Sequence, residues 1–242
     1  MMKRLHDYSQ YFLRNPRFVK ELIGHTDIKK SDSVVDIGAG SGIITASLAT
    51  KCRHVYAYEL ESSTIKTLRK NTEQFTNVTI VEEDFLSASL PDTPYKVCAN
   101  IPFHLSSPII KKLTESAHRP LSIYLIVQKQ FAHKLLINDS RFTGLLGAQV
   151  APIYTTKIKM RLKRTDFMPH PAVDTVLVEL KQRSELLIPE DRLSKYRKFV
   201  ADCFHSPELF ARAKGSDNPH NEPLKPSQLT ADEWQRLFMK QR

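Results

Sequence analysis

The chain has 242 residues, of which 41% are hydrophobic, and its formal net charge is +10 at pH 7. This length is ample for a hydrophobic core, and no apolar run approaches the roughly 18 to 20 residues that cross a bilayer. The first residues also lack the apolar stretch of a signal peptide. These features exclude a membrane-spanning protein and predict a cytoplasmic, globular one. The basic excess favours a polyanionic partner such as nucleic acid.

Short apolar runs alternate with helical patterns through the first three quarters of the chain. The expected strands are residues 33–38, 54–59, 77–84, 96–102 and 122–128. Amphipathic helices are expected between them, at residues 42–51, 62–74 and 107–117. Strands that are apolar on both faces and separated by helices form parallel sheets. The pattern therefore predicts a doubly wound, Rossmann-like α/β sheet.

The pattern changes after the fifth expected strand. Residues 144–162 and 172–183 are expected to be strands joined by a turn-rich segment, so that the sheet ends in an antiparallel hairpin. Residues 193–204 and 230–240 are expected to be short amphipathic helices. We therefore expect a catalytic domain at residues 1–182, followed by a small helical domain at residues 183–242 that assists RNA binding.

Three cysteines, Cys52, Cys98 and Cys203, are far apart in the chain. Their odd number and wide spacing indicate neither a disulfide framework nor a zinc site. We expect them to pack in the core, and we expect no bound metal.

Three of the seven glycines, Gly38, Gly40 and Gly42, lie together in GAGSG, after one expected strand and before a helix. Such a loop lets the backbone turn tightly and approach a ligand closely. Ile43 breaks the dinucleotide pattern G-x-G-x-x-G, and the loop has no Walker lysine. The loop with Asp36 upstream fits S-adenosylmethionine better, with Asp36 either anchoring the loop or meeting the ammonium group of the ligand.

Acidic residues follow the next two strands. Glu59 stands about 20 residues beyond the loop, where an acid can accept hydrogen bonds from ribose hydroxyls. Asp84 ends the third strand, where it can accept from an adenine amine, and Leu60 and Phe85 stand beside these acids. Acids at strand ends often only cap the next helix, but three at successive strand ends converge on one crevice. The sequence thus predicts a site for an adenosine-containing cofactor.

The segment Asn100-Ile101-Pro102-Phe103 follows the fourth strand, next to the same crevice. An exocyclic amine is a weak nucleophile because its lone pair is delocalised into the ring. Hydrogen bonds to the Asn100 side-chain oxygen and to a carbonyl near Ile101 would localise that lone pair, and Pro102 can aim the carbonyl. Phe103 offers a face for a base rotated out of its helix. We expect methyl transfer without a metal or a covalent nucleophile, and no acid–base role for His104.

These motifs, with SQYFL at residues 9–13 and FMPHP at residues 167–171, closely resemble the bacterial rRNA adenine N6-methyltransferases of the erythromycin-resistance type. The resemblance implies that Gln10, Tyr11 and Leu13 close over the methionine end of S-adenosylmethionine. It also implies that Asn100 contacts the cofactor as well as the target adenine, and that Phe167 flanks the base or the methyl group. It further implies a monomer that methylates 23S rRNA and confers macrolide resistance.

Two departures from the family pattern stand out. Tyr11 occupies the place of the usual asparagine, so that a backbone or ring contact must replace an amide contact. Phe103 replaces the commoner tyrosine, which removes a hydroxyl group but leaves the stacking face.

A basic segment at residues 157–164 contains Lys157, Lys159, Arg161 and Lys163 at alternate positions. On a strand, alternate side chains share one face, so these four are expected to follow an RNA backbone, although a solvated outer face would have the same pattern.

Three other functions also fit parts of the pattern. The housekeeping small-subunit (16S) rRNA adenine dimethyltransferases share the fold and most motifs, but DIGAGSG and NIPF favour the resistance type. A non-catalytic RNA-binding homologue is disfavoured by the intact Gly38, Glu59, Asp84 and Asn100. A DNA adenine methyltransferase would need a base-reading element that the sequence does not reveal.

Overall fold

A computed structural model describes residues 11–137, 142–215 and 224–241. The chain divides into two compact units, one of Met1–Lys129 with Ile158–Leu180 and the other of Gln130–Lys157 with Lys181–Arg242. This division differs from the boundary expected at residue 182, because residues 130–157 group with the C-terminal helices. The Tyr196 hydroxyl donates to the Ala148 carbonyl at 3.0 Å, and the Gln149 side chain donates to the Arg197 carbonyl at 3.0 Å.

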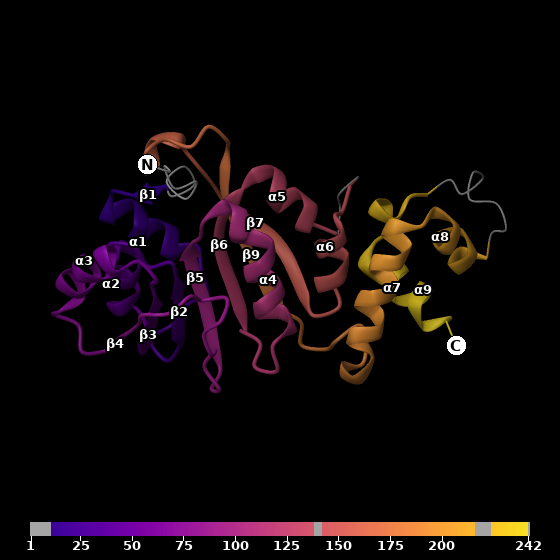
Figure 1. Ribbon diagram of the computed structural model, residues 1–242, viewed down its shortest axis with the longest axis horizontal. Helices are drawn as coiled ribbons and strands as arrows, with labels where there is room; N and C mark the ends of the chain where they lie inside the picture. The colour runs from indigo at the N-terminus through magenta and orange to yellow at the C-terminus, as the bar shows by residue number, and fades with distance from the viewer. Residues whose placement is uncertain (1–10, 138–141, 216–223, 242) are drawn as a thin grey trace, which may run out of the picture. The chain divides into compact units, whose positions relative to one another are not determined.

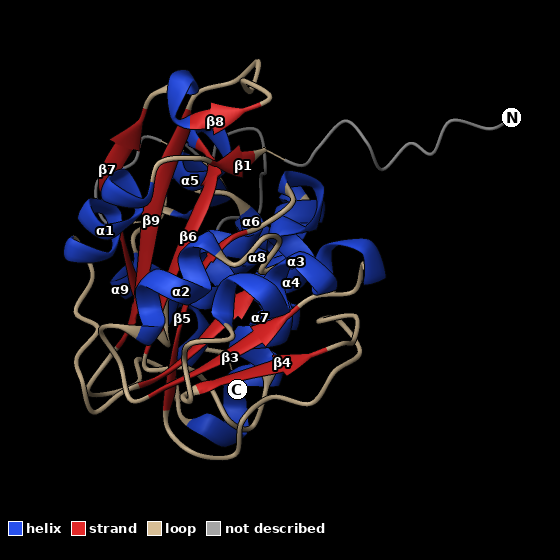
Figure 2. Ribbon diagram, turned by 90° about the vertical axis from the view of Figure 1, so that its left-hand side faces the viewer, coloured by secondary structure: helices blue, strands red, loops and turns tan. Residues whose placement is uncertain are grey.

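Seven strands form one sheet in the order β4-β3-β2-β5-β6-β9-β7 (Figure 1). Their bounds are Ser33–Ile37 for β2, His54–Tyr58 for β3, Val78–Val81 for β4, Tyr95–Asn100 for β5, Ser122–Gln128 for β6, Tyr154–Leu162 for β7 and Thr175–Gln182 for β9. The strands from β2 to β6 pair in parallel. Figure 2 shows β3 and β4 running at an angle to β6 and β9, which is the twist common to such sheets.

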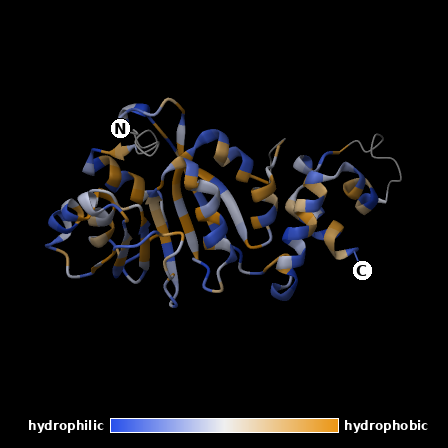
Figure 3. Cartoon of the chain, in the orientation of Figure 1, coloured by the Kyte–Doolittle hydropathy of each residue, from blue (hydrophilic) through white to orange (hydrophobic). Residues whose placement is uncertain are grey.

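The central strands are buried along almost their whole length. Every residue of β2 is buried, and in β6 only Gln128 is partly exposed. Figure 3 shows hydrophobic colour along these strands, whereas the helices carry both colours. Parallel strands read as continuous apolar runs because helices cover both of their faces.

The helices of the first unit are α1 at Pro16–Gly24, α2 at Ile43–Ala49, α3 at Ser62–Thr72 and α4 at Ser106–Glu115. Helix α1 is not among the helices expected from the sequence, although its start has a clear signal. The Asn15 side chain accepts from the backbone of Arg17 and Phe18, and Pro16 occupies the first helical position. Val19, Leu22 and Ile23 form its buried face.

The sheet ends in the predicted hairpin of β7 and β9. The backbone N–H of Arg183 donates to the carbonyl of Ile153, and the Thr155 hydroxyl donates to the carbonyl of Lys181. These pairs run in opposite directions along the two strands, so the hairpin is antiparallel.

The expected strand at residues 144–162 is wrong at its start, where residues Leu145–Val150 form helix α6. A short apolar run fits a buried strand and a buried helix equally well. A β-carbon at Gly147 would lie 2.5 Å from the carbonyl oxygen of Lys134, so glycine lets α6 approach the helix α5, Lys129–Leu135, closely.

Two very short strands, β1 at Phe12–Leu13 and β8 at Phe167–Met168, form a separate antiparallel pair. Leu13 lies opposite Phe167, and Phe12 lies opposite Met168. This pair fixes residues 12–13 to the segment that follows β7.

The second unit contains the helices α7 at Leu193–His205, α8 at Pro207–Lys214 and α9 at Ala231–Met239, in addition to α6. The expected helices at residues 193–204 and 230–240 are therefore present. Trp234 is fully buried, and Phe199, Phe204 and Phe210 pack around its ring. This aromatic cluster is the core of the helical part.

Candidate active site

A cavity of about 340 Å³ lies at the carboxyl ends of β2, β3 and β5, where ligands bind in open α/β sheets. Its size suits a small organic ligand. It is lined by residues from five segments, namely Tyr11 to Leu13, Asp36 to Ile44, Tyr58 to Thr64, Glu83 to Leu86 and Asn100 to Leu105, and by Ile109. Nearly all predicted site residues in the described part of the chain therefore lie together.

The glycine loop depends on backbone conformations that other residues rarely adopt. Gly38, Gly40 and Gly42 all have positive φ, at 65°, 57° and 88°. A β-carbon at Gly42 would lie 2.7 Å from the Leu68 side chain, and one at Gly40 would lie 3.4 Å from the Phe12 ring. The loop can thus pass close beneath Phe12 and leave its backbone facing the cavity.

Glu59 fastens this loop to the end of β3. Its carboxylate accepts from the backbone N–H of Gly40 at 2.8 Å and from those of Leu60 and Glu61 at 2.9 Å each. A carboxylate has roughly four acceptor positions, so capacity remains for a hydroxyl group of a ligand. Glu59 can therefore order the loop and bind a ribose at the same time.

Asp36 lies beneath the loop and is only 1% exposed. The Thr45 hydroxyl donates to its carboxylate at 2.6 Å, which links β2 to α2. Burial raises the pKa of Asp36 to about 7, the hydrogen bond from Thr45 lowers it, and the negative charge of Glu59 raises it. Two roles were expected for Asp36, either anchoring the glycine loop or meeting the ammonium group of the ligand. This geometry supports the first role.

The buried Asp36 leads to a prediction about pH. A folded-state pKa of about 7 lies above the ordinary value of 3.8, so the stabilising contribution is complete below about pH 4 and is lost as the pH rises through 7. We expect Asp36→Asn to gain stability relative to wild type across this window, by on the order of a few kcal/mol. Urea unfolding at a series of pH values measures this. The exposed Asp92→Asn is the control, and parallel curves for wild type and Asp36→Asn would contradict the prediction.

Asn100 is oriented by the amino-terminal segment. Its side-chain nitrogen donates to the carbonyl oxygen of Tyr11 at 2.6 Å. A carbonyl can only accept, so the amide nitrogen must face Tyr11, and the side-chain oxygen is left to accept from another donor. Asn100 lines the cavity, so this oxygen is available to a donor group of a ligand.

The loop after Asn100 has a second acceptor. The Pro102 carbonyl accepts from the backbone of Leu105 at 2.9 Å, and the Phe103 carbonyl accepts from the Ser106 hydroxyl at 2.8 Å. Each of these two carbonyls thus has an acceptor position filled within the loop, whereas no residue in the described part of the chain is seen donating to the carbonyl of Ile101, next to Asn100.

Phe103 is half-buried, and its ring lies against the ring of Tyr11 with centroids 5.3 Å apart. Tyr11 therefore contacts the site twice, through its carbonyl at Asn100 and through its ring at Phe103. Through these contacts Tyr11 positions both Asn100 and Phe103.

Asp84 and Phe85 also line the cavity. The carboxylate of Asp84 accepts from the backbone of Leu86 at 2.9 Å, and Phe85 packs edge to face with Tyr58. Lys112, which is not among the site residues expected from the sequence, lies 5.4 Å above the Phe85 ring and donates to the carbonyls of Leu86 and Ala88. Burial lowers its pKa, and the negative charges of Asp84 and Glu83 oppose that effect. Lys112 thus fixes this loop from α4.

One expected catalytic residue of the described part of the chain lies elsewhere. Phe167 does not line the cavity; it is fully buried and packs in the core with Leu13. In β8 its side chain points inward because strand side chains alternate. Gln10 lies outside the described residues.

Comparisons with known proteins identify the chain. A model of the family described as ribosomal RNA adenine dimethylase matches residues 1–211. The chain belongs to this family. It is 33% identical over 199 residues to ribosomal RNA small subunit methyltransferase A of Thermotoga neapolitana, covering 81% of this chain and 73% of the relative. It is 30% identical over 200 residues to the mitochondrial ribosomal RNA small subunit methyltransferase of Arabidopsis thaliana, covering 81% of this chain but only 52% of the relative.

Two solved structures show the same fold. The 23S rRNA methyltransferase ErmE has a TM-score of 0.78 at 24% identity, covering 94% of this chain and 98% of that one. A dimethyladenosine transferase from Plasmodium falciparum has a TM-score of 0.74 at 22% identity, covering 94% of this chain and 96% of that one. The predicted fold class, family, enzyme class and cofactor are confirmed: the chain is an rRNA adenine methyltransferase that uses S-adenosylmethionine.

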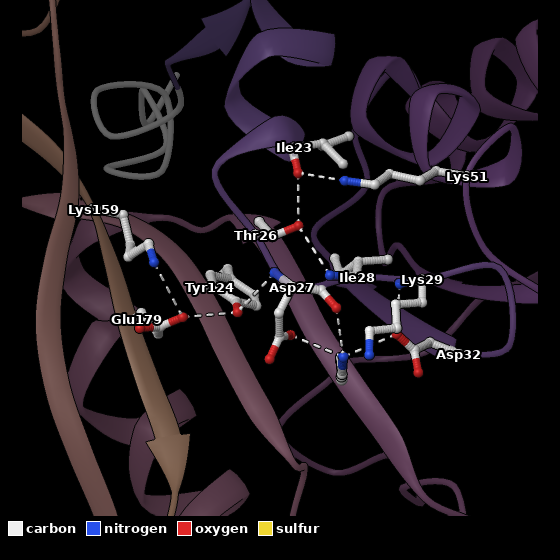
Figure 4. Close-up of polar contacts among 11 residues, drawn as sticks. Ile23, Thr26, Asp27, Ile28, Lys29, Asp32, Lys51, Tyr124, Lys159 and Glu179 are labelled. Carbon is white, nitrogen blue, oxygen red and sulfur yellow. Dashed lines mark hydrogen bonds and ion pairs between the residues drawn. The ribbon is translucent and has the colours of Figure 1, made fainter.

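The four basic residues of this methyltransferase that were expected to contact RNA are all exposed at alternate positions along β7 and just beyond it. Lys159 is partly neutralised, because its ammonium group lies 3.6 Å from the carboxylate of Glu179 (Figure 4). Glu179 also accepts from the Tyr124 hydroxyl at 2.8 Å. Lys157, Arg161 and Lys163 are therefore the better candidates for phosphate contacts.

In residues 11–137, 142–215 and 224–241, every helix is too short or too polar to span a bilayer. Within the same ranges, no three His, Cys, Asp or Glu side chains form a group that could hold a metal ion. Cys52, Cys98 and Cys203 are all buried.

Proposed function

We propose that this methyltransferase transfers a methyl group from S-adenosylmethionine to N6 of an adenine in small-subunit rRNA. The observation that supports the chemistry best is the fixed amide of Asn100, whose nitrogen is held by Tyr11 so that its oxygen is available at the cavity. The choice of small-subunit rRNA rests on the two curated relatives named above, which both carry that name. The sequence motifs favour 23S rRNA, whereas these relatives favour the small-subunit alternative.

The cavity fits the cofactor in residue types and in size. The glycine loop gives a close approach for the amino-acid end, Glu59 has remaining acceptor capacity for the ribose, and Asp84 with Phe85 suits an adenine ring. S-adenosylmethionine supplies an activated methyl group on a sulfonium. Asn100 and the Ile101 carbonyl would orient the target amine.

In this proposal the two amine protons of the target adenine are donated to the Asn100 side-chain oxygen and to the Ile101 carbonyl. The nitrogen then becomes more nearly tetrahedral, and its lone pair is directed toward the methyl group. The adenine lies on the exposed face of Phe103, since Tyr11 covers the other side. After transfer, the methylated nitrogen carries a positive charge. It loses a proton readily, so no strong base is required.

A second candidate is N6-methylation of 23S rRNA with macrolide resistance as its consequence. The sequences DIGAGSG at residues 36–42 and NIPF at residues 100–103 favour it. The residues that bind cofactor and orient the amine would have the same roles, so the active site does not distinguish the two substrates. Recognition of the correct rRNA has to come from the RNA-binding surface.

Transfer of labelled methyl groups to isolated ribosomal subunits distinguishes these candidates. We expect the purified chain to label unmethylated small subunits, or their assembly precursors, and to leave large-subunit rRNA unlabelled. Label confined to large-subunit rRNA, together with macrolide resistance in an expressing strain, would favour the second candidate instead.

We also propose that the basic face of β7 contacts the rRNA backbone, with the helices of residues 183–242 assisting. Replacing Lys157, Arg161 and Lys163 with glutamine should weaken RNA binding and reduce the salt dependence of log K by about 2, because roughly 0.7 counterions are released per phosphate contact on single strands. Binding isotherms at several salt concentrations measure this. Replacing the exposed Lys30, Lys66 and Lys70 gives an equal loss of charge as a control, and equal slopes for the two triple variants would contradict the assignment.

A further inference from the structure

The outer face of the β1–β8 pair presents two large apolar side chains to solvent. Phe12 is 40% exposed and Met168 is 44% exposed, and the two residues lie directly opposite each other in the register. Their strand neighbours Leu13 and Phe167 point into the core instead. Exposed apolar residues scattered singly need no explanation, but a cross-strand pair makes a continuous apolar surface.

This surface lies at the edge of the cofactor cavity. Phe12 lines the cavity and covers Gly40, and the adjacent Tyr11 packs on Phe103. Met168 does not line the cavity. The Phe12–Met168 surface therefore begins at the cavity edge and extends beyond it, on the side of Phe103, the ring that is proposed to hold the target base.

The flanking chain is strongly basic. No aspartate or glutamate occurs in residues 11–20, which contain β1, or in residues 157–165, which lead into β8. Arg14, Arg17, Lys163 and Arg164 are exposed in these segments, although Arg164 also pairs with Asp174 at 3.3 Å. An apolar surface with a basic border suits single-stranded nucleic acid, which has flat base faces and a phosphate backbone.

We propose that Phe12 and Met168 form a ledge that receives a nucleotide next to the target adenine in the rRNA. This inference rests on the proposed function. Rotation of the target adenine out of its helix unstacks its neighbour, and the exposed Phe12 ring offers that neighbour a new stacking surface. The thioether of Met168 makes favourable contacts with aromatic rings and adapts its shape to either purines or pyrimidines. The ledge thereby lowers the cost of extruding the target.

Fluorescence of 2-aminopurine tests this without turnover. The probe is a short RNA that carries the mapped target adenine, with 2-aminopurine on one side of it or on the other, mixed with protein and S-adenosylhomocysteine. We expect the wild type to change the fluorescence at one flanking position, and Met168→Ala to weaken RNA binding by about 3- to 10-fold and to reduce that change. S-adenosylhomocysteine affinity should stay the same, because Met168 lies outside the cavity. Met168→Phe should retain the effect.

The control is Leu121→Ala, which removes an equally exposed apolar side chain just before β6, at the amino end of a parallel strand and so at the opposite edge of the sheet from the cavity. No fluorescence change at either flanking position in the wild type would overturn the ledge. A loss of S-adenosylhomocysteine affinity in Met168→Ala would also overturn it, because Phe12 and Met168 would then cover the cofactor. Because the assay needs only binding, a wild type that binds the RNA but labels no small-subunit rRNA would refute the proposed substrate and leave the ledge standing.

Discussion

Asn100→Ala is expected to lower the single-turnover rate of methyl transfer by about 10²- to 10³-fold, the loss typical of a positioned polar group at a reacting centre. The alanine variant has no acceptor for the amine of the target adenine, and it also loses the hydrogen bond to the Tyr11 carbonyl. S-adenosylhomocysteine affinity should change by only a few fold, roughly the worth of one net hydrogen bond. Rapid-mixing assays with labelled cofactor and calorimetry measure the two quantities separately.

Two variants sharpen this prediction. Asn100→Asp keeps an acceptor but places it against the Tyr11 carbonyl, so it should also be slow. Asn77→Ala removes another half-buried amide, one that donates to the carbonyls of Ala49 and Cys52, and it should reduce stability without slowing transfer. A rate for Asn100→Ala within about threefold of wild type would show that the amide only positions Tyr11.

Glu59→Ala is expected to weaken S-adenosylhomocysteine binding by about 100-fold or more. The substitution leaves the backbone N–H groups of Gly40, Leu60 and Glu61 without their acceptor, and hydrogen bonds to a charged group contribute about 1.5–3 kcal/mol each. The loop then loses its order, and the ligand loses an acceptor for its ribose. Calorimetric titration with S-adenosylhomocysteine measures the loss.

Glu59→Gln should be intermediate. It keeps one acceptor oxygen for Leu60 and Glu61, but its amide nitrogen faces the N–H of Gly40. The exposed Glu73→Ala, at the end of α3, is the control for loss of a carboxylate. Affinity unchanged in Glu59→Ala would mean that the glycine loop is held in place by its positive-φ glycines alone.

Much of the sheet and the cavity could be predicted because their signals are local. Buried parallel strands are continuous apolar runs, and the acid or amide that ends each of them follows directly in sequence. Parallel strands bring these ends together, so Glu59, Asp84 and Asn100 could be placed in one crevice from the sequence alone.

The remainder depends on contacts between distant segments. Lys112 acts on a loop more than 20 residues earlier, and nothing in its own helix indicates that its ammonium group reaches the Leu86 carbonyl. The strands β1 and β8 are too short for any periodicity, so the inward direction of Phe167 and the outward direction of Met168 could not be read from FMPHP. Helix α6 could not be told from a strand for the same reason. Its Gly147 is needed for close packing against Lys134, which is a nonlocal contact.

The most direct test of the central claim is mass-spectrometric mapping of methylated adenines in rRNA from cells that express the wild-type chain, the Asn100→Ala variant or neither. The account predicts an N6-methylated adenine in small-subunit rRNA that appears with the wild type and is missing with Asn100→Ala. A methylated adenine found only in large-subunit rRNA, or the same modification with Asn100→Ala, would contradict it.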